Sequence, residues 1–219
     1  MEGTTSILNS AAGFIQNGGI FMWVILAIWG TAMAIAIERF KQLSLKYDVD
    51  GPSFMNELQR YVLSNDIQGA IRICSGTDAA LPKVLKSGLK RSEQSSDQVQ
   101  NAIDATALEV IPKVERRLNW LNLFANISTL FGLLGTIQGL IQSFSAVAAA
   151  DPAQKAELLA MGISKAMNTT ALGLFSAITI MLVHTFLVGK SEKIINEIDE
   201  FSVKLMDMLG TKKEVAKAE

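Results

Sequence analysis

Hydroxyl-bearing residues recur at helical spacing within two otherwise apolar stretches of the sequence. In the first stretch three of them are seven residues apart and would form one line along a helix face: Thr129, Thr136 and Ser143. In the second stretch four polar or small residues would stay roughly on one side of a helix: Lys165, Thr169, Gly173 and Ser176. Residues of this kind could hold neighbouring helices together or line a path for ions.

The chemistry of these two lines allows two interpretations. A hydroxyl in a membrane helix can bond its own backbone at the preceding turn or a neighbouring helix. Aligned hydroxyl oxygens on adjacent helices could instead line an ion path. Neither line contains Asp or Glu, so neither could carry a proton by itself. If ions pass here, we expect the titrating carboxylate to come from another chain.

Small residues accompany the hydroxyls in both stretches. Apolar burial gives little driving force between helices in lipid, so such helices associate through small residues that allow close approach. We therefore expect the following glycines to form a helix contact: Gly132, Gly135, Gly139, Gly162 and Gly173.

The elements that position these residues follow from the distribution of charge. The chain contains 20 Lys and Arg against 21 Asp and Glu, but three windows are almost free of them: 20–37, 118–150 and 161–189. About 20 apolar residues cross the ~30 Å hydrocarbon core of a bilayer. We therefore predict an all-α membrane protein with three transmembrane helices and no large soluble core. With 49% hydrophobic residues and a net charge of −1, the chain is neither disordered nor a basic nucleic-acid binder.

Basic residues near the ends of the spans predict the orientation. Residues 1–19 contain no Lys or Arg, and the connection at 151–160 contains only Lys155. Basic residues instead flank the spans within 39–117 and 190–219. We therefore expect the N-terminus and the short connection to lie outside, which is periplasmic in a bacterial inner membrane, and the other two regions to be cytoplasmic.

The segment before the first span has a character of its own. Residues 1–19 are small and polar with a few apolar members, which favours a short amphipathic segment at the membrane surface. Ala34-Ile35-Ala36 resembles a signal-peptide cleavage site, but no basic residue precedes the apolar run. We therefore favour an uncleaved transmembrane helix over 20–38.

The cytoplasmic regions are predicted to be helical. Pro52 suits the first turn of a helix, and Asp66 could cap the next one. From Gln98 the apolar spacing predicts a helix that runs into the second span, with Pro112 as a possible bend. After the third span, apolar residues at heptad spacing predict a helical seam: Ile194, Ile198, Phe201, Leu205 and Met208.

Three single residues have competing interpretations. A cation at the bilayer centre costs at least ~2.5–3.5 kcal/mol, so Lys165 could snorkel to the interface, pair with Glu157 or Asp151, or face a carboxylate of a partner helix. We expect His184 to be buried and hydrogen-bonded, with a proton relay as the alternative. We expect the single cysteine, Cys74, to be a small buried hydrophobic residue.

The sequence offers no nucleophile–base pair, phosphate-binding loop, or set of metal ligands. We therefore expect neither enzymatic activity nor a cofactor or metal.

Motifs along nearly the whole chain resemble those of the MotA/TolQ/ExbB family of proton channels, and most closely its ExbB/TolQ branch. Those of the first span and the following region are Gly18-Gly19, Met22-Trp23, Glu38-Arg39, Asp66, Gly69-Ala70, Cys74, Pro82 and Gly88-Leu89. Those before and within the second span are Pro112, Glu115-Arg116-Arg117-Leu118, Leu121, Gly132-Leu133-Leu134-Gly135-Thr136 and Gly139. Those of the third span are Gly162-Ile163, Ala166, Thr170-Ala171 and Gly173-Leu174.

The resemblance implies a homopentamer of long helices in the inner membrane of a Gram-negative bacterium, with the second and third spans around a central pore. Two copies of a single-span partner of the ExbD/TolR kind would sit inside the pore and bring an aspartate. The family's lining threonines correspond to Thr136 and Thr170. Ion flow would turn the pentamer around the partner and pass force to a client of the TonB or TolA kind, in uptake or envelope maintenance.

The sequence departs from the branch at three positions. Lys165 stands where the branch commonly has Glu, and Thr129 and Thr179 stand where it often has Pro. Lys165 removes a possible carboxylate relay and could neutralise the partner aspartate. Extra hydroxyls at Thr129 and Thr169 would suit Na⁺, although we favour H⁺. A passive membrane scaffold, held together by its polar stripes, is the alternative of another class.

Overall fold

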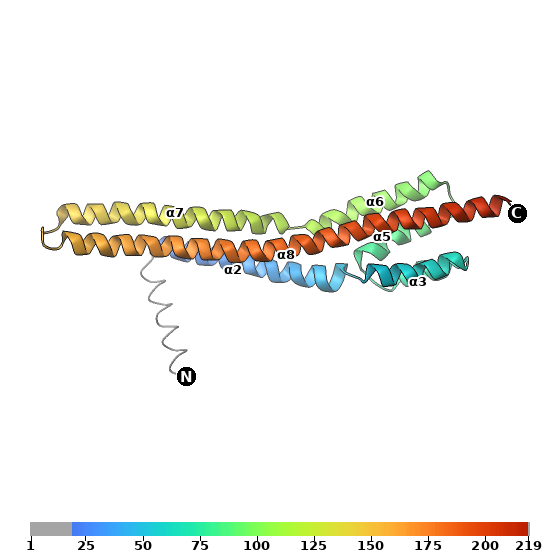
Figure 1. Ribbon diagram of the computed structural model, residues 1–219, viewed down its shortest axis with the longest axis horizontal. Helices are drawn as coiled ribbons and strands as arrows, with labels where there is room; N and C mark the ends of the chain where they lie inside the picture. Colours follow the sequence, from blue (N-terminus) through green and yellow to red (C-terminus); the bar gives the residue numbers. More distant parts are fainter. Residues whose placement is uncertain (1–18, 219) are drawn as a thin grey trace, which may run out of the picture. The chain divides into compact units, whose positions relative to one another are not determined.

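The computed structural model describes residues 19–218, with side chains described for 19–211. The described chain is helical and contains no strand, which confirms the all-α prediction within this range. Its elements in chain order (Figure 1) are α2 (Ile20–Lys41), the π-helix η1 (Gln42–Tyr47), α3 (Gly51–Leu63), α4 (Ile67–Ser75), α5 (Ala80–Leu89), α6 (Ser96–Glu115), α7 (Leu118–Ala149) and α8 (Lys155–Ala218). The amphipathic segment expected over 1–19 lies outside the described residues, apart from Gly19.

The described chain divides into two compact units. The spanning unit comprises the described residues of Met1–Ile37 together with Arg117–Thr185. The polar unit comprises Glu38–Arg116 and the described residues of Phe186–Glu219. The long helix α8 contributes its first half to the spanning unit and its second half to the polar unit.

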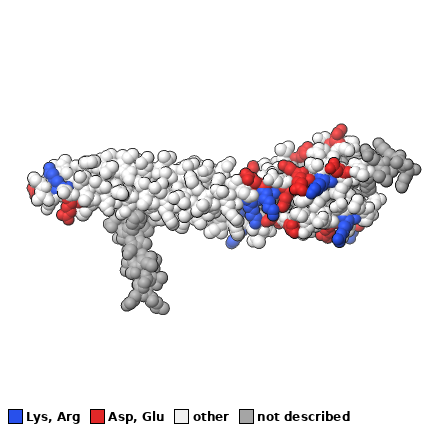
Figure 2. Space-filling model, viewed as in Figure 1, with Lys and Arg blue, Asp and Glu red and all other residues white. Residues whose placement is uncertain are grey.

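Three helical stretches are long and apolar enough to cross a membrane, as predicted. They are Ile20–Leu63, Ser96–Ala149 and Lys155–Thr211, with mean hydropathies of 2.3, 1.4 and 2.1 in their most apolar windows. Large apolar side chains of the spanning unit remain exposed in the single chain, for example Leu130 at 63% and Leu182 at 69%. The visible face of this unit is nearly free of charge except at the end that carries the connection between α7 and α8 (Figure 2). Lipid or other helices must therefore cover this surface.

The helix expected to run from Gln98 into the second span is interrupted, so that prediction is wrong. α6 begins at Ser96 behind a capping box formed by Ser95 and Gln98, and it ends at Glu115. Arg117 then adopts a left-handed backbone conformation with φ of 63°, and α7 begins at Leu118. A left-handed backbone conformation cannot continue a right-handed helix. Pro112 lies inside α6, three residues before its end at Glu115.

α8 begins earlier than its apolar window. Its first residue is Lys155, within the predicted connection at 151–160. The first turns of α8 therefore precede the stretch of membrane-compatible composition, because a helix can continue through the interface where lipid no longer requires apolar side chains.

The polar unit has a core of its own. Its largest buried side chains include Leu58, Leu81, Leu85, Leu89 and Ile103, from α3, α5 and α6. The predicted seam of α8 is buried at four of its five positions: Ile194, Ile198, Phe201 and Leu205. Met208 is only partly buried, and the neighbouring Leu209 is buried instead.

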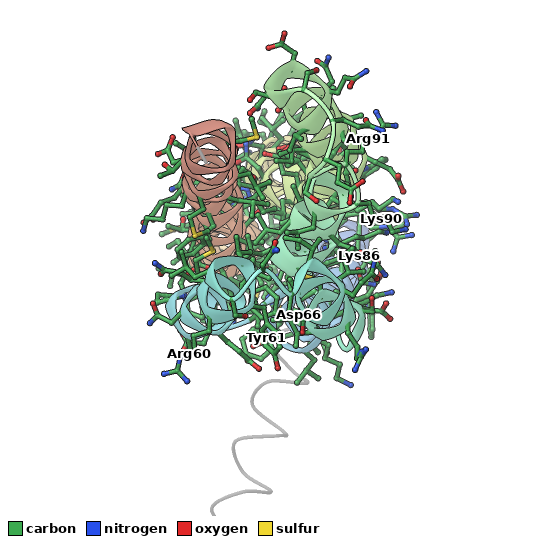
Figure 3. The ribbon with its side chains drawn as sticks, turned by 90° about the vertical axis from the view of Figure 1, so that its right-hand side faces the viewer. Arg60, Tyr61, Asp66, Lys86, Lys90 and Arg91 are labelled. Carbon is green, nitrogen blue, oxygen red and sulfur yellow. The ribbon has the colours of Figure 1, made fainter. Side chains whose placement is uncertain are left out.

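Local signals within the polar unit are confirmed. The Asp66 carboxylate accepts a hydrogen bond from the Gly69 backbone N–H at 2.8 Å and so caps α4. Pro52 lies in the first turn of α3. Cys74 is buried, and burial raises the pKa of its thiol to about 12, as expected for a structural cysteine. Lys86, Lys90 and Arg91 point outward from α5 and the turn after it (Figure 3).

Candidate ion pathway and helix contact

Glycines bring the backbones of α7 and α8 together in the spanning unit. A Cβ added to Gly173 would lie 2.8 Å from the carbonyl oxygen of Ser128 and 2.9 Å from the Cα of Gly132. A Cβ added to Gly132 would lie 3.3 Å from the Cα atoms of Gly173 and Thr170. The close approach at Gly173 leaves no room for a side chain, because the neighbouring atoms belong to the backbone.

The other glycines expected in the contact lie along the same interface. Gly135 faces the side chain of Thr169, and Gly162 faces Ser143. A Cβ added to Gly139 would come within 2.8 Å of the Cβ of Ala166. The small residues thus alternate between the two helices along the whole contact.

The hydroxyl groups of the two helices differ in their partners. The Thr170 hydroxyl donates to the carbonyl oxygen of Gly132 on the facing helix at 2.9 Å. The hydroxyls of Thr129 and Thr136 donate instead to carbonyls of their own helix, those of Ala125 at 3.3 Å and Leu133 at 2.6 Å. Thr170 therefore ties the two helices together, whereas Thr129 and Thr136 satisfy only local carbonyls.

The contact between α7 and α8 has two edges, and the candidate residues divide between them. Successive residues turn by about 100° in an α-helix, so the angular positions follow from the sequence once Gly132 and Gly173 mark the facing surfaces. On this basis Thr136 and Thr170 lie on one edge, together with Thr129. The other edge carries Lys165 and Thr169.

The first transmembrane helix, α2, packs on the edge that carries Lys165. The ring of Phe21 lies 6.3 Å from that of Phe131 on α7. The indole N–H of Trp29 donates to the Thr179 hydroxyl on α8 at 2.9 Å. By the same helical geometry, Phe131 on α7 and Thr179 on α8 both lie on the edge that carries Lys165. The edge with Thr129, Thr136 and Thr170 is therefore the one that α2 leaves uncovered.

Ser143 stands apart from the two threonines in its predicted line. It is 5% exposed, packs against Gly162, and donates to the Gly139 carbonyl oxygen at 2.6 Å. Seven residues turn about 20° less than two full turns, so a line at this spacing drifts around the helix. The drift carries Ser143 into the helix contact, while Thr129 and Thr136 remain at the edge.

Lys165 has an exposed side chain and forms no ion pair within the described part of the chain. The pairing with Glu157 or Asp151 considered above is not seen there. Its Cε would lie 3.9 Å from a Cβ added to Gly19, at the start of α2. Lys165 therefore lies on the side of α8 that faces the beginning of the first span.

Several polar contacts of the spanning unit have no counterpart in the sequence analysis. The hydrogen bond between Trp29 and Thr179 joins residues 150 positions apart, and no local sequence pattern predicts it. Ser128 is fully buried and its hydroxyl has no partner among the described residues. Ser128 could have been singled out, because Ala125, Ser128, Gly132 and Gly135 recur at the spacing of the buried face. His184, which we expected to be buried, is only half-buried.

Arg39 forms an unpredicted contact in the polar unit. Its side chain is 1% exposed, and one guanidinium nitrogen donates to the carbonyl oxygens of both Lys113 and Val114 at 2.9 Å. The other terminal nitrogen donates to the side chain of Gln42 at 2.6 Å. The carbonyls belong to the last turn of α6, where helical carbonyls lack partners within the helix. Arg39 thus joins the end of the first apolar helix to the end of α6.

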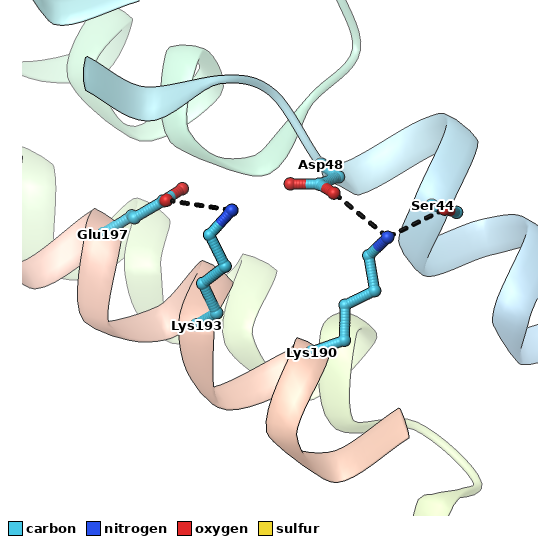
Figure 4. Close-up of polar contacts among 5 residues, drawn as sticks. All are labelled: Ser44, Asp48, Lys190, Lys193 and Glu197. Atoms are coloured by element: carbon cyan, nitrogen blue, oxygen red, sulfur yellow. Dashed lines mark hydrogen bonds and ion pairs between the residues drawn. The ribbon is translucent and has the colours of Figure 1, made fainter. Parts of the chain in front are cut away.

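A second polar network joins α8 to the segment before α3 in the polar unit (Figure 4). The Lys190 ammonium lies 3.1 Å from the Asp48 carboxylate and 2.7 Å from the Ser44 hydroxyl. Lys193 and Glu197 pair at 3.5 Å, and only 14% of the Glu197 side chain is exposed. Burial raises the pKa of Glu197, against the lowering influence of Lys193, and the charges of Asp48 and Asp50 raise it further.

No cluster of three or more His, Cys, Asp or Glu residues suited to a metal occurs among the described residues. The apolar stretches 118–150 and 158–189 contain no Asp or Glu, so the hydroxyl-bearing edge of α7 and α8 has no titrating acid of its own.

Comparisons with known proteins show the family of the chain. The model of the MotA/TolQ/ExbB proton channel family matches residues 77–200. A putative biopolymer transport protein ExbB homolog of Methanothermobacter thermautotrophicus is 24% identical over 200 residues, covering 91% of this chain and 70% of its own. The Tol-Pal system protein TolQ of Haemophilus influenzae is 34% identical over 96 residues, which cover 42% of each chain.

A solved structure shares the fold. The structure of C. jejuni MotAB contains a chain that matches with a TM-score of 0.55 at 15% identity, covering 94% of this chain and 92% of that one. With the family model spanning more than half of the sequence, the chain belongs to the MotA/TolQ/ExbB proton channel family, with relatives in its ExbB/TolQ branch.

Proposed function

We propose that this protein is the ion-channel subunit of an ExbB/TolQ-like inner-membrane motor, in which the proton motive force drives a periplasmic or outer-membrane process. Family membership supports the class of activity. The observation that carries the proposal is the edge of α7 and α8 that bears Thr129, Thr136 and Thr170 and is not covered by α2. In an assembly, this edge is the part of the wall that can face a central pore.

The uncovered edge supplies hydroxyls but no titratable group. The ion-carrying carboxylate therefore belongs to a partner, a single-span protein of the ExbD/TolR kind present in two copies inside a homopentamer. Thr136 and Thr170 offer their hydroxyls to that carboxylate, and protonation releases it to the next subunit. One charge crossing 100 mV releases about 2.3 kcal/mol, enough to bias each such step.

The orientation in the membrane and the client complete the proposed function. The N-terminus is periplasmic and the C-terminus cytoplasmic, as the distribution of basic residues predicts. The client is of the TonB or TolA kind and serves uptake or envelope maintenance. The protein is not an enzyme and uses no cofactor.

A passive scaffold is the second candidate, favoured by the hydrogen bond between Thr170 and Gly132. This bond and the glycine contacts around it hold α7 against α8 without any ion. Under this alternative, the hydroxyls serve assembly alone.

The two candidates predict different outcomes for threonine substitutions in cells that carry the partner. Thr136→Ala and Thr170→Val should abolish client function while the oligomer still assembles. Thr31→Ala on α2 is the matched control for Thr136→Ala, because both hydroxyls donate to a carbonyl of their own helix. Normal client function in both pore variants would refute the channel proposal, and loss of the oligomer would favour the scaffold.

The driving ion needs its own measurement. In proteoliposomes that contain the protein and its partner, we expect flux to follow a pH gradient and to persist without Na⁺. Flux that requires Na⁺ and ignores the pH gradient would instead support the sodium-driven version of the same motor.

A further inference from the structure

A cavity of about 400 Å³ opens between the start of α2 and the edge of α7 and α8 that carries Lys165. We propose that it binds the head group of a membrane phospholipid, with the phosphate held by Lys165. This site lies on the edge opposite Thr136 and Thr170, so it goes beyond the proposed ion path.

Three polar side chains of the cavity can donate hydrogen bonds. Lys165 contributes an ammonium group, and Gln138 and Gln142, one helical turn apart on α7, contribute two carboxamides. None of the three has a hydrogen bond or ion pair with another described residue. An ammonium group beside two carboxamides, each of which can turn an N–H toward a ligand, suits an oxyanion.

The depth of the cavity corresponds to the level of lipid head groups. Lys165 is the only charged residue between Leu158 and Gly189, and 25 positions separate it from Lys190. Arg117 and Gln142 are also 25 positions apart, across a window without charge. At 1.5 Å per residue each interval spans about 37 Å, between the ~30 Å hydrocarbon core and the ~40–45 Å bilayer with its polar regions. Lys165 and Gln142 therefore reach the head groups of one leaflet when Lys190 and Arg117 lie at the other.

The rest of the cavity lining suits the apolar part of a lipid. Ile20 and Phe21 lie beside the donors, and Ile20 is 74% exposed in the single chain. Gly19, Gly135 and Gly139 complete the lining and contribute backbone without side chains. An amphipathic cavity with cationic and apolar sides at the interface matches a phospholipid better than a free anion.

The position of α2 also favours lipid over a partner helix. A partner inside the pore would meet the edge with Thr136 and Thr170, whereas Lys165 lies on the side that α2 covers. The nearest charge that precedes Lys165 along α8 is Glu157, eight residues or about 12 Å away. A lipid phosphate therefore provides the counter-charge that the described chain does not place next to Lys165.

Native mass spectrometry of the purified full-length protein in detergent, titrated with dioleoylphosphatidylglycerol, tests the proposal. We expect about one retained lipid per protomer, and at least a tenfold weaker apparent affinity in Lys165→Met. Lys155→Met is the matched control, because it removes the same charge from the same helix, ten residues away, and should bind normally. Lys165→Arg should retain the lipid, and Gln142→Leu should weaken binding without a change of charge.

The ligand's chemistry is tested with two further probes. Dioleoylglycerol, which has the same tails but no phosphate, should not be retained, and inorganic phosphate at millimolar concentration should not compete. Equal binding by Lys165→Met and Lys155→Met, or equal retention of dioleoylglycerol, would overturn the proposal. Full competition by inorganic phosphate would show a small-anion site instead. Displacement of the lipid by the single-span partner in wild type, with partner binding lost in Lys165→Met, would assign Lys165 to a partner carboxylate.

Discussion

Arg39 shows how one side chain joins two distant parts of the chain in the polar unit. Its guanidinium group reaches carbonyl oxygens 74 and 75 positions away in the sequence. Arginine suits this role because its donors form a rigid, planar fork that stays charged. The contact also places a positive charge at the C-terminal end of α6, where the helix dipole favours it.

Arg39→Met should destabilise the protein more than any surface arginine substitution. It removes the donors of two carbonyl groups in a buried place, and an unsatisfied buried acceptor costs about 1–3 kcal/mol. We expect a lower unfolding temperature in detergent, measured by circular dichroism, and only partial recovery with Arg39→Lys, which has no fork. Arg60→Met, on the exposed surface of α3, is the control. Equal unfolding temperatures for the two variants would contradict this role.

Glu197 introduces a pH dependence into the polar unit. Its pKa is raised above the ordinary value of 4.5 by burial, with Asp48 and Asp50 acting in the same direction. Between the ordinary and the raised pKa the folded state therefore binds more protons than the unfolded state. The free energy of unfolding then falls as the pH rises through this window.

Glu197→Gln should remove this pH dependence, because glutamine is neutral throughout. The stability of wild type relative to the variant should be greatest at pH 4.5 and below, and should decrease as the pH is raised to 7. Urea unfolding of both proteins at a series of pH values measures the difference. Glu200→Gln, at an exposed ion pair with Lys204, serves as the control. A difference that grows with pH would contradict the assignment.

At the scale of elements, the contact between α7 and α8 depends on atoms that glycine lacks. The Cα of Gly132 and the carbonyl oxygen of Ser128 occupy the space where a side chain at Gly173 would lie. Close backbone approach brings the Thr170 hydroxyl within 2.9 Å of the facing Gly132 carbonyl. The glycines and the interhelical hydrogen bond are therefore parts of one arrangement.

Gly173→Ala should separate α7 from α8 and lower stability by about 1–3 kcal/mol, as overpacking does. Gly30→Ala on α2 is the matched control, because a Cβ there has no atom within 4 Å. Since alanine favours helix by about 1 kcal/mol over glycine, the control should be neutral or stabilising. Thermal unfolding of both variants in detergent checks this. A Gly173→Ala variant as stable as Gly30→Ala would show that the helices can separate without loss.

At the scale of the whole molecule, three spanning stretches place the connection between the first and second spans and the connection between the second and third spans on opposite sides of the membrane. The described chain joins α7 to α8 by residues 150–154, and joins α2 to α7 through the whole set of helices from α3 to α6. Most basic residues near the ends of the spans lie on the side of the membrane that carries the helices from α3 to α6, which is therefore the expected cytoplasmic side.

Single cysteines in a Cys74→Ala background should report this topology in intact cells. Ala153→Cys, in the exposed short connection, should react with a membrane-impermeant maleimide added from outside. Ser75→Cys, exposed at the end of α4, should react only after the membrane is permeabilised. The reverse pattern would invert the orientation and contradict the predicted periplasmic N-terminus.

Much of the fold could be predicted because its signals are local. The charge-free windows predict the three spans, Asp66 and Pro52 predict their helix starts, and the heptad spacing predicts four buried residues of α8. Each of these signals depends on residues a few positions apart, and for such residues helical geometry alone determines which of them share one face of the helix.

The sequence by itself also determined the family and the absence of a carboxylate from the hydroxyl lines. Only the tertiary structure decided that Thr136 and Thr170 share the edge that α2 leaves uncovered, and that Lys165 lies on the opposite edge. It also decided the break at Arg117 and the contact of Arg39 with α6. The physical reason is that a helical pattern defines which residues lie together on one helix, whereas the face that meets another helix depends on packing between residues distant in the sequence.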